Sequence, residues 1–297
     1  MKNGGALMKK YVSLIMDIEK SKSYDINDRN EMQHYIDKCI KNLNILFDEG
    51  MQCEVTFSAG DELQGLFHDV VTALLYFRML EMLVNPVKIR AGIGIGDWTV
   101  KMEQGLSTQQ DGPAYHKARQ AIEAARSMQL QNVRICSDND DILANHLMNA
   151  SLPLKRQQVY MQNMVQVLME LLFPFVPASI KLGRYDVVKE LIAVKFEYRL
   201  GSKNRGVYSR RNIVMEQEVL NLNEIPAVLP IYINGEIADA ESAIIKKNTA
   251  LIISEILRCS RQNVVSIMRR GNSNKIRELD YVALQYVKKH YGGSRWN

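Results

Sequence analysis

The segment Ile89 to Gly96, which reads IRAGIGIG, constrains the fold of this chain more than any other part of the sequence. Apolar residues alternate there with Arg90 and with three glycines, Gly92, Gly94 and Gly96. A period of two predicts a β-strand that has one apolar face and one almost bare face. Because glycine weakens a strand, three on one face predict that a helix, another backbone segment or a ligand approaches closely.

Short apolar runs and amphipathic segments surround this strand. Tyr11 to Met16 reads as a buried strand that ends at Asp17. The remaining elements are expected, in order, as a helix over 29–47 capped by Asp28, strands over 54–57 and 63–67, a helix over 70–83, a strand over 87–95, a helix over 114–128 and a strand over 133–136. The order β-α-β-β-α-β with an added helix and strand predicts an α+β fold of the ferredoxin-like, palm type.

Two aspartates are expected to meet at one end of the predicted sheet. Asp17 ends the first strand, and Asp61 lies in the short link between two strands, where a hairpin tip is expected. If the first strand and the hairpin are neighbours, these carboxylates converge and can hold Mg²⁺ against a phosphorylated ligand. The alternative is that Asp17 only ends a strand and Asp61 only forms a turn, as aspartate often does.

The segment Asp111 to Arg119 (DGPAYHKAR) predicts a loop that enters a helix. Tyr115 and Arg119 lie one turn apart on the same helix face, from which they can reach a phosphate or a base. The alternative is an ordinary solvent-exposed helix face. The Gly-x-Gly-x-Gly of the glycine strand does not predict a dinucleotide-binding turn, because no helix begins directly after it.

Four ordered segments together resemble the SatD family and, through it, the class III nucleotidyl cyclases. They are Asp17–Lys22, Ser58–Phe67, Ile89–Gly96 and Asp111–Arg119. The resemblance implies that Asp17, Asp61 and the backbone carbonyl of Ile18 bind Mg²⁺ or Mn²⁺. It also implies a nucleoside triphosphate or other nucleotide as ligand, and a homodimer.

The same resemblance assigns further residues to the nucleotide site. Arg119 takes the place of the cyclase arginine that stabilises the reacting phosphates, and Tyr115 stands where cyclases have asparagine. Phe57 replaces the lysine with which cyclases read a purine. The glycines expected next to a bound nucleotide are Gly60, Gly92, Gly94 and Gly96.

Residues 249–270 fit a helix-turn-helix. Ile253 and Leu257 are apolar positions of its first helix, Ser254 is small enough for close helix contact, and Ser260 can cap the second helix. Arg258 stands where glycine often lies. The predicted DNA-binding residues are Arg258, Ser260, Arg261, Gln262, Asn263, Arg269 and Arg270. The surrounding basic residues favour phosphate contacts. The alternative is a helical hairpin that mediates dimerisation.

The chain has 297 residues, and we expect three parts. These are a SatD or cyclase-like domain over 8–138, a mainly helical connecting region over 139–240 with a basic patch over 203–211, and a helix-turn-helix domain over 241–297. Isolated cysteines and the lack of a long apolar run predict a cytoplasmic protein with no membrane partner. The sequence thus favours a DNA-binding regulator that senses metal and nucleotide; an active nucleotidyl cyclase or phosphoryl transferase and a protein-binding scaffold remain alternatives.

Overall fold

The computed structural model describes residues 10–58, 60–102, 105–177, 185–197, 220–225, 228–238 and 241–292. The basic patch over 203–211 lies outside the described residues. The strands are β1 (Tyr11–Ile18), β2 (Met51–Phe57), β3 (Leu63–Phe67), β4 (Ile89–Gly96), β5 (Val133–Cys136), β6 (Phe175–Pro177) and β7 (Ile231–Ile233). The α-helices are α1 (Ile26–Phe47), α2 (Val70–Val84), α3 (Pro113–Arg126), α4 (Ile142–Met148), α5 (Leu152–Gln157), α6 (Tyr160–Leu172), α7 (Tyr185–Glu197), α8 (Glu241–Ile244), α9 (Thr249–Ile256), α10 (Arg261–Arg270) and α11 (Ser273–Tyr291).

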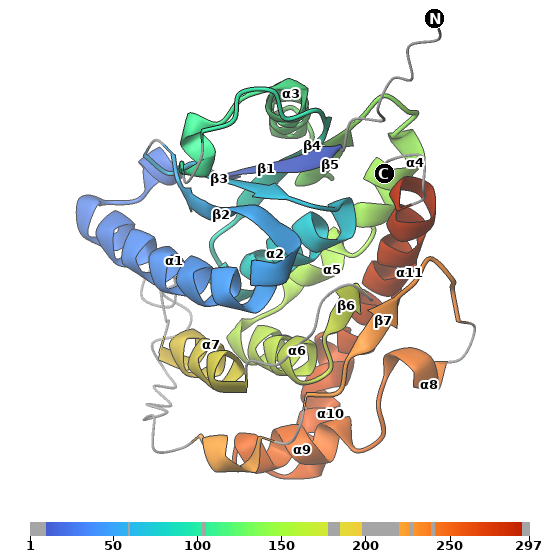
Figure 1. Ribbon diagram of the computed structural model, residues 1–297. Helices are drawn as coiled ribbons and strands as arrows, with labels where there is room; N and C mark the ends of the chain where they lie inside the picture. The colour runs from blue at the N-terminus through green and yellow to red at the C-terminus, as the bar shows by residue number, and fades with distance from the viewer. Residues whose placement is uncertain are drawn as a thin grey trace, which may run out of the picture.

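The largest sheet has the strand order β2-β3-β1-β4-β5. β1 pairs antiparallel with both β3 and β4, β2 pairs antiparallel with β3, and β4 runs parallel to β5. α1 and α2 lie on one face of the sheet, and α3 lies on the other (Figure 1). The prediction of an α+β fold with a helical C-terminal region is therefore confirmed.

The central strand β1 contributes side chains to both faces of the sheet. Leu14 and Met16 belong to the large core shared with α1 and α2, whereas Ile15 packs with Ala118 and Ile122 of α3. Side chains alternate between the faces of a strand. Asp17, two residues after Ile15, is therefore directed to the α3 side.

The bare face of β4 is covered by the backbone of α3. A Cβ atom placed on Gly92 would overlap the carbonyl oxygen of Ala118, and one on Gly94 would overlap backbone atoms of Ala114 and Ala118. The close approach that the glycines predicted is therefore made by a helix. Close helix packing accounts for the missing side chains, and it leaves no room for a nucleotide against Gly92 and Gly94.

The start of α1 differs from the prediction. Helix α1 begins at Ile26, and the carboxylate of Asp25 accepts a hydrogen bond from the backbone N–H of Asp28 at 2.8 Å. Asp25 is therefore the N-cap, and the assignment of that role to Asp28 was wrong. Both aspartates suit a helix start, because a carboxylate there satisfies free backbone N–H groups and the positive end of the helix dipole.

The helices after the sheet share one apolar core with it. This core runs from β1, α1 and α2 through α6, α7, α9 and α11. The connecting region also contains strand β6, which pairs in parallel with β7 over Phe175–Pro177 and Ile231–Ile233. The region is therefore helical with a small added sheet.

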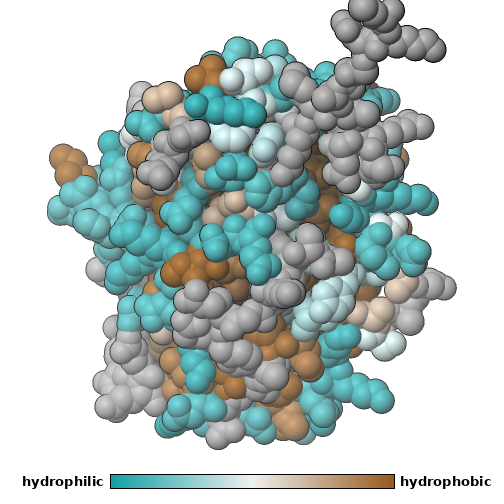
Figure 2. Space-filling view, viewed as in Figure 1, coloured by the Kyte–Doolittle hydropathy of each residue, from teal (hydrophilic) through white to brown (hydrophobic). Residues whose placement is uncertain are grey.

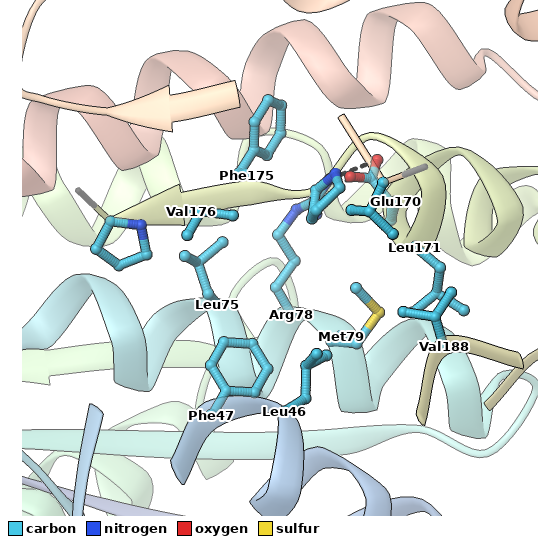
Figure 3. Close-up of a pocket in the computed structure, with 13 residues that line it drawn as sticks. Leu46, Phe47, Leu75, Arg78, Met79, Glu170, Leu171, Phe175, Val176 and Val188 are labelled. Carbon is cyan, nitrogen blue, oxygen red and sulfur yellow. Dashed lines mark hydrogen bonds and ion pairs between the residues drawn. The ribbon is translucent and has the colours of Figure 1, made fainter. Parts of the chain in front are cut away.

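A buried ionic cluster joins α2 to the later helices. The guanidinium of Arg78 lies 2.8 Å from the carboxylate of Glu170 on α6 and 2.6 Å from that of Asp280 on α11. Lys155 of α5 lies 3.1 Å from Asp280, and Arg277 of α11 pairs with Glu170. Figure 3 shows Arg78 extending from α2 toward Glu170 among apolar side chains. Burial disfavours the Glu170 carboxylate, but the charges of Arg277 and Arg78 outweigh this and lower its pKa.

The surface is uneven in polarity. Figure 2 shows hydrophilic side chains over most of the upper half of one face, whereas hydrophobic side chains gather in its lower half. Among the described helices, none combines the length and the apolar character that crossing a bilayer requires.

Candidate functional site

The end of β1 and the tip of the β2–β3 hairpin lie at the same end of the sheet. Met16 of β1 pairs with Leu63, the first residue of β3, so Asp17 lies just beyond this pair and Asp61 lies two residues before Leu63, in the turn that leads into β3. Gly60 and Asp61 form the turn between the strands, and Gly60 has a φ of +64°. Glycine adopts this left-handed conformation without strain. The two aspartates are thus brought to one end of the sheet by adjacent strands.

Two arginines bind the carboxylate of Asp17. Arg90, its register partner on β4, donates from Nε to Oδ1 at 3.2 Å. Arg126 at the end of α3 donates from Nε and Nη2 to Oδ2 at 2.9 and 2.7 Å. Burial disfavours the charged guanidinium of Arg126, but the hydrogen bond and the charge of Asp17 outweigh this and raise its pKa. Asp17 is therefore neutralised within the protein.

A second ion pair links α3 to the hairpin tip. Arg119 lies 2.5 Å from the carboxylate of Glu62, which also accepts a hydrogen bond from the hydroxyl of Ser58 at 2.8 Å. The side chain of Arg119 is 51% exposed, whereas that of Glu62 is 14% exposed. The predicted phosphate-binding arginine therefore faces solvent from the same end of the sheet.

The predicted metal ligands are only partly arranged for a cation. Asp61 has no hydrogen bond or ion pair among the described residues, so its carboxylate is open to a ligand. Within the same part of the chain, no group of three histidine, cysteine or acidic side chains is close enough to hold a metal ion. Mg²⁺ usually takes one or two carboxylates together with phosphate oxygens and water. Asp17, Asp61 and the Ile18 carbonyl would suit a cation delivered with phosphate, not one held by protein alone.

Tyr115 lies apart from the cluster around Asp17. Its side chain is buried, and its hydroxyl lies 3.2 Å from that of Ser107 in the loop before α3. Burial raises the pKa of this phenol well above its usual value. Tyr115 therefore fixes the loop to α3, whereas Arg119, one turn later, reaches the hairpin tip.

Sequence reasoning did not identify Arg90, Arg126 and Glu62 as members of this cluster. Arg90 could have been found, because it occupies the glycine face of the alternating strand, the side on which Asp17 lies. Arg126 follows Arg119 by seven residues, which is two turns of a helix and hence the same face. Its contact with Asp17 required knowing where α3 crosses the sheet.

Helices α9 and α10 form the second candidate site. The apolar positions Ile253 and Leu257 expected in the first helix are buried, and so is the small Ser254. Val264 and Ile267 of α10 are buried as well. The hydroxyl of Ser260 accepts a hydrogen bond from the backbone N–H of Asn263 at 3.2 Å, so Ser260 is the N-cap of α10 as predicted. Arg258 in the turn has a φ of +49°. Its conformation is therefore the one for which glycine is favoured at this position.

The predicted DNA-binding side chains lie on the outer side of this helix pair. The exposed residues include Arg258, Ser260, Arg261, Gln262, Asn263, Arg269 and Arg270. An open groove runs beside α10, and Lys246, Arg261, Arg269 and Lys275 are among the residues that line it. Of these, only Lys275 has an acidic partner within the described part, Glu278 at 2.9 Å. The helix pair therefore presents a basic surface.

These features define the class of the protein. It is an α+β protein in which carboxylates and arginines meet at one end of the sheet, and a basic helix pair follows near the C-terminus. The SatD family model matches residues 11–210, which is more than half of the chain. The chain belongs to the SatD family, as its motifs predicted. A comparison with curated proteins finds no significant match.

Proposed function

We propose that this SatD family protein is a regulator that binds DNA through α9 and α10. The observation that carries the proposal is the combination of a buried apolar seam with the left-handed turn at Arg258 and an exposed start of α10. Helix-turn-helix proteins insert the start of the second helix into the major groove. Arg261, Gln262 and Asn263 occupy that position, and arginine, glutamine and asparagine suit base edges.

A homodimer is part of this proposal, because a two-fold protein presents two recognition helices. Paired half-sites about one helical turn of DNA apart would then be the target. The basic groove beside α10 is lined by Lys246 and Lys275, which belong to the surrounding basic residues expected to contact phosphate. Binding dominated by such contacts weakens steeply with salt.

A mobility-shift titration on a pool of genomic fragments tests the proposal. The change Arg261→Ala with Gln262→Ala is expected to weaken specific binding about tenfold or more, since one good base contact contributes ~1–3 kcal/mol. Lys41→Ala removes an exposed cation of α1 that pairs with Asp37 and is the matched control, with unchanged affinity. Equal binding by the wild type and the α10 variant would reject α10 as the reading helix, and no binding by the wild type would favour a protein-binding scaffold.

The second proposed function is the binding of a divalent cation, Mg²⁺ or Mn²⁺, with a nucleotide at the end of β1. The strand order β2-β3-β1-β4 with antiparallel pairing supports a ferredoxin-like, cyclase-type domain, in which α1 and α2 share one sheet face. The meeting of Asp17 and the hairpin tip supports the ligand assignment. Asp17 and Asp61 would hold the cation, which would offset phosphate charge, and Arg119 would contact phosphate.

Titration calorimetry with each nucleoside triphosphate and Mg²⁺ or Mn²⁺ tests this second function. The double change Asp17→Ala, Asp61→Ala is expected to abolish the cation-dependent part of the binding. Binding that is the same with and without the double change would reject the metal site. Product analysis in the same mixtures distinguishes an active cyclase or phosphoryl transferase, which forms cyclic or transferred product, from a sensor, which returns the triphosphate unchanged.

A further inference from the structure

Three arginines surround the end of β1 at the sheet end just described. Arg90 projects from β4, whereas Arg119 and Arg126 project from the same face of α3. Each is held by at least one carboxylate: Arg90 by Asp17, Arg119 by Glu62, and Arg126 by both Asp17 and Glu123. The three positive charges are therefore matched by three carboxylates.

These arginines remain accessible from solvent. The side chains of Arg90, Arg119 and Arg126 are 20%, 51% and 40% exposed. Among the described residues, Arg90 donates only from Nε and Arg119 only from one terminal nitrogen, so N–H donors of both remain for a ligand. An arginine carries five donors in a rigid fork that matches a phosphate as well as it matches a carboxylate.

A carboxylate and a phosphate therefore compete for the same guanidinium edges. Asp17 is 9% exposed and Glu62 is 14% exposed, so both are shielded partners that stay in place while the arginines face solvent. A ligand with several phosphate groups offers more charge and more oxygen atoms than either carboxylate. Such a ligand can first engage the N–H donors that the carboxylates leave open, and full engagement of the guanidinium edges draws the arginines away from Asp17 and Glu62.

We propose that Arg90, Arg119 and Arg126 form a binding site for a polyphosphate group and that Asp17 and Glu62 hold this site closed by occupying the arginines. This proposal deepens the proposed nucleotide binding at the same sheet end by naming its regulation, but it needs no metal ion. When the arginines turn to phosphate, Asp17 loses its two partners and becomes free. Phosphate binding and cation binding therefore favour each other, because each needs the same ion pairs to open.

The sharpest test uses inorganic triphosphate in buffer that contains a chelator, with calorimetry as the readout. Glu62→Gln removes the competing charge from Arg119 and is expected to raise the affinity about tenfold, equivalent to ~1.4 kcal/mol. Asp17→Asn acts on Arg90 and Arg126 and is expected to change affinity in the same direction. The joint change Arg119→Gln, Arg126→Gln is expected to abolish binding.

Asp37→Asn is the matched control, because it also removes one carboxylate from an ion pair, that with Lys41 on the exposed side of α1. It should leave triphosphate affinity at the wild-type value. Thermal unfolding of every variant checks the fold, and Glu62→Gln remains decisive if Asp17→Asn does not fold. Unchanged or weaker binding by Glu62→Gln, or no binding by any variant, would overturn the proposal.

Two further comparisons distinguish inorganic triphosphate from a nucleotide as the ligand, and the arginine site from the metal site. Equal affinity for inorganic triphosphate and nucleoside triphosphates would indicate recognition of the phosphates alone, whereas tighter binding of one nucleotide would indicate an added base contact; both support the arginine site. Tighter metal-free binding by Glu62→Gln, with no effect of Mg²⁺ in the wild type, would support the arginine site and reject the metal site. If triphosphate binding by the wild type depends on Mg²⁺ and Glu62→Gln has the wild-type affinity, the metal site is supported and the arginine site is rejected.

Discussion

Lys195 of α7 donates a hydrogen bond from its buried Nζ to the carbonyl oxygen of Leu83, at 2.9 Å, near the end of α2. It donates another to the carbonyl oxygen of Asn85 at 2.8 Å. No carboxylate pairs with this amine among the described residues. The lysine thus satisfies carbonyls at the C-terminal end of α2, where a helix favours a positive group.

The stability of the protein should therefore depend on pH through Lys195. Burial lowers the pKa of Lys195 from 10.5 to about 7. Between these values the unfolded chain binds a proton that the folded chain lacks, so the free energy of unfolding rises with pH, by at most ~1.4 kcal/mol per pH unit. Urea unfolding from pH 7 to pH 9 should show this rise in the wild type and a flatter profile in Lys195→Met. If the free energy of unfolding changes with pH in the same way in the wild type and in Lys195→Met, Lys195 is not the group responsible.

The pH window has an upper limit that is set by a thiol. Burial raises the pKa of Cys39 from 9.0 to about 12. Above pH 9 the unfolded chain loses this proton before the folded chain does, so Cys39 lowers the free energy of unfolding as pH rises. The comparison of the wild type with Lys195→Met is therefore made at or below pH 9, because the charge of Lys195 itself lowers the pKa of Cys39 and the contribution of the thiol differs between the two proteins.

The ionic cluster at Arg78 is expected to be essential for stability. Glu170→Gln removes the partner of both Arg78 and Arg277 and leaves buried positive charge, which costs ~3–5 kcal/mol. Glu278→Gln breaks the exposed pair with Lys275 and should cost less than about 1 kcal/mol. Chemical unfolding measures both values. Similar small losses in the two variants would contradict the role of the buried cluster.

Gly94 and Gly60 are expected to respond differently to alanine. Gly94→Ala drives a Cβ atom into the backbone of α3, so overpacking should cost ~3 kcal/mol. Gly60→Ala meets no atom within 4 Å, and only its φ of +64° opposes the change, at a cost of ~1 kcal/mol. Thermal unfolding of the two variants decides this. Equal costs would mean that α3 does not lie against β4 as described.

Arg258 offers a test that separates stability from DNA binding. Its left-handed backbone favours glycine, so Arg258→Gly should stabilise the protein by about 1 kcal/mol. The same change removes an exposed cation beside α10. The slope of log affinity against log salt concentration for DNA binding should therefore become smaller by about one, the value for one phosphate contact. Unfolding and salt titration measure the two effects. A loss of stability would mean that the turn is built differently.

Local sequence patterns predicted the strands and helices of the sheet well. The alternation in β4, the apolar run of β1 and the hairpin link at Gly60 and Asp61 depend on near neighbours in the chain, which a sequence displays directly. Ser260 was found as a cap for the same reason. The cap of α1 was misplaced by three residues, because Asp25 and Asp28 both suit a helix start.

Contacts between distant segments could not be read from the sequence. The pairing of β6 with β7 and the buried partners of Arg78 join residues that are far apart in the chain. The pairing of Asp17 with Arg126 depends on where α3 crosses the sheet. Sequence therefore located the acidic end of β1, whereas only the structure showed that arginines neutralise it.

The central claim, that α10 contacts DNA, is tested most directly by hydrogen–deuterium exchange with and without a short duplex at low salt. Bound DNA should slow exchange of the backbone amides from Arg258 to Arg270 and leave those of α1 unchanged. At low salt the phosphate contacts suffice for binding without a specific sequence. Protection elsewhere, with unaltered exchange in α10 under conditions where the duplex is bound, would contradict the account.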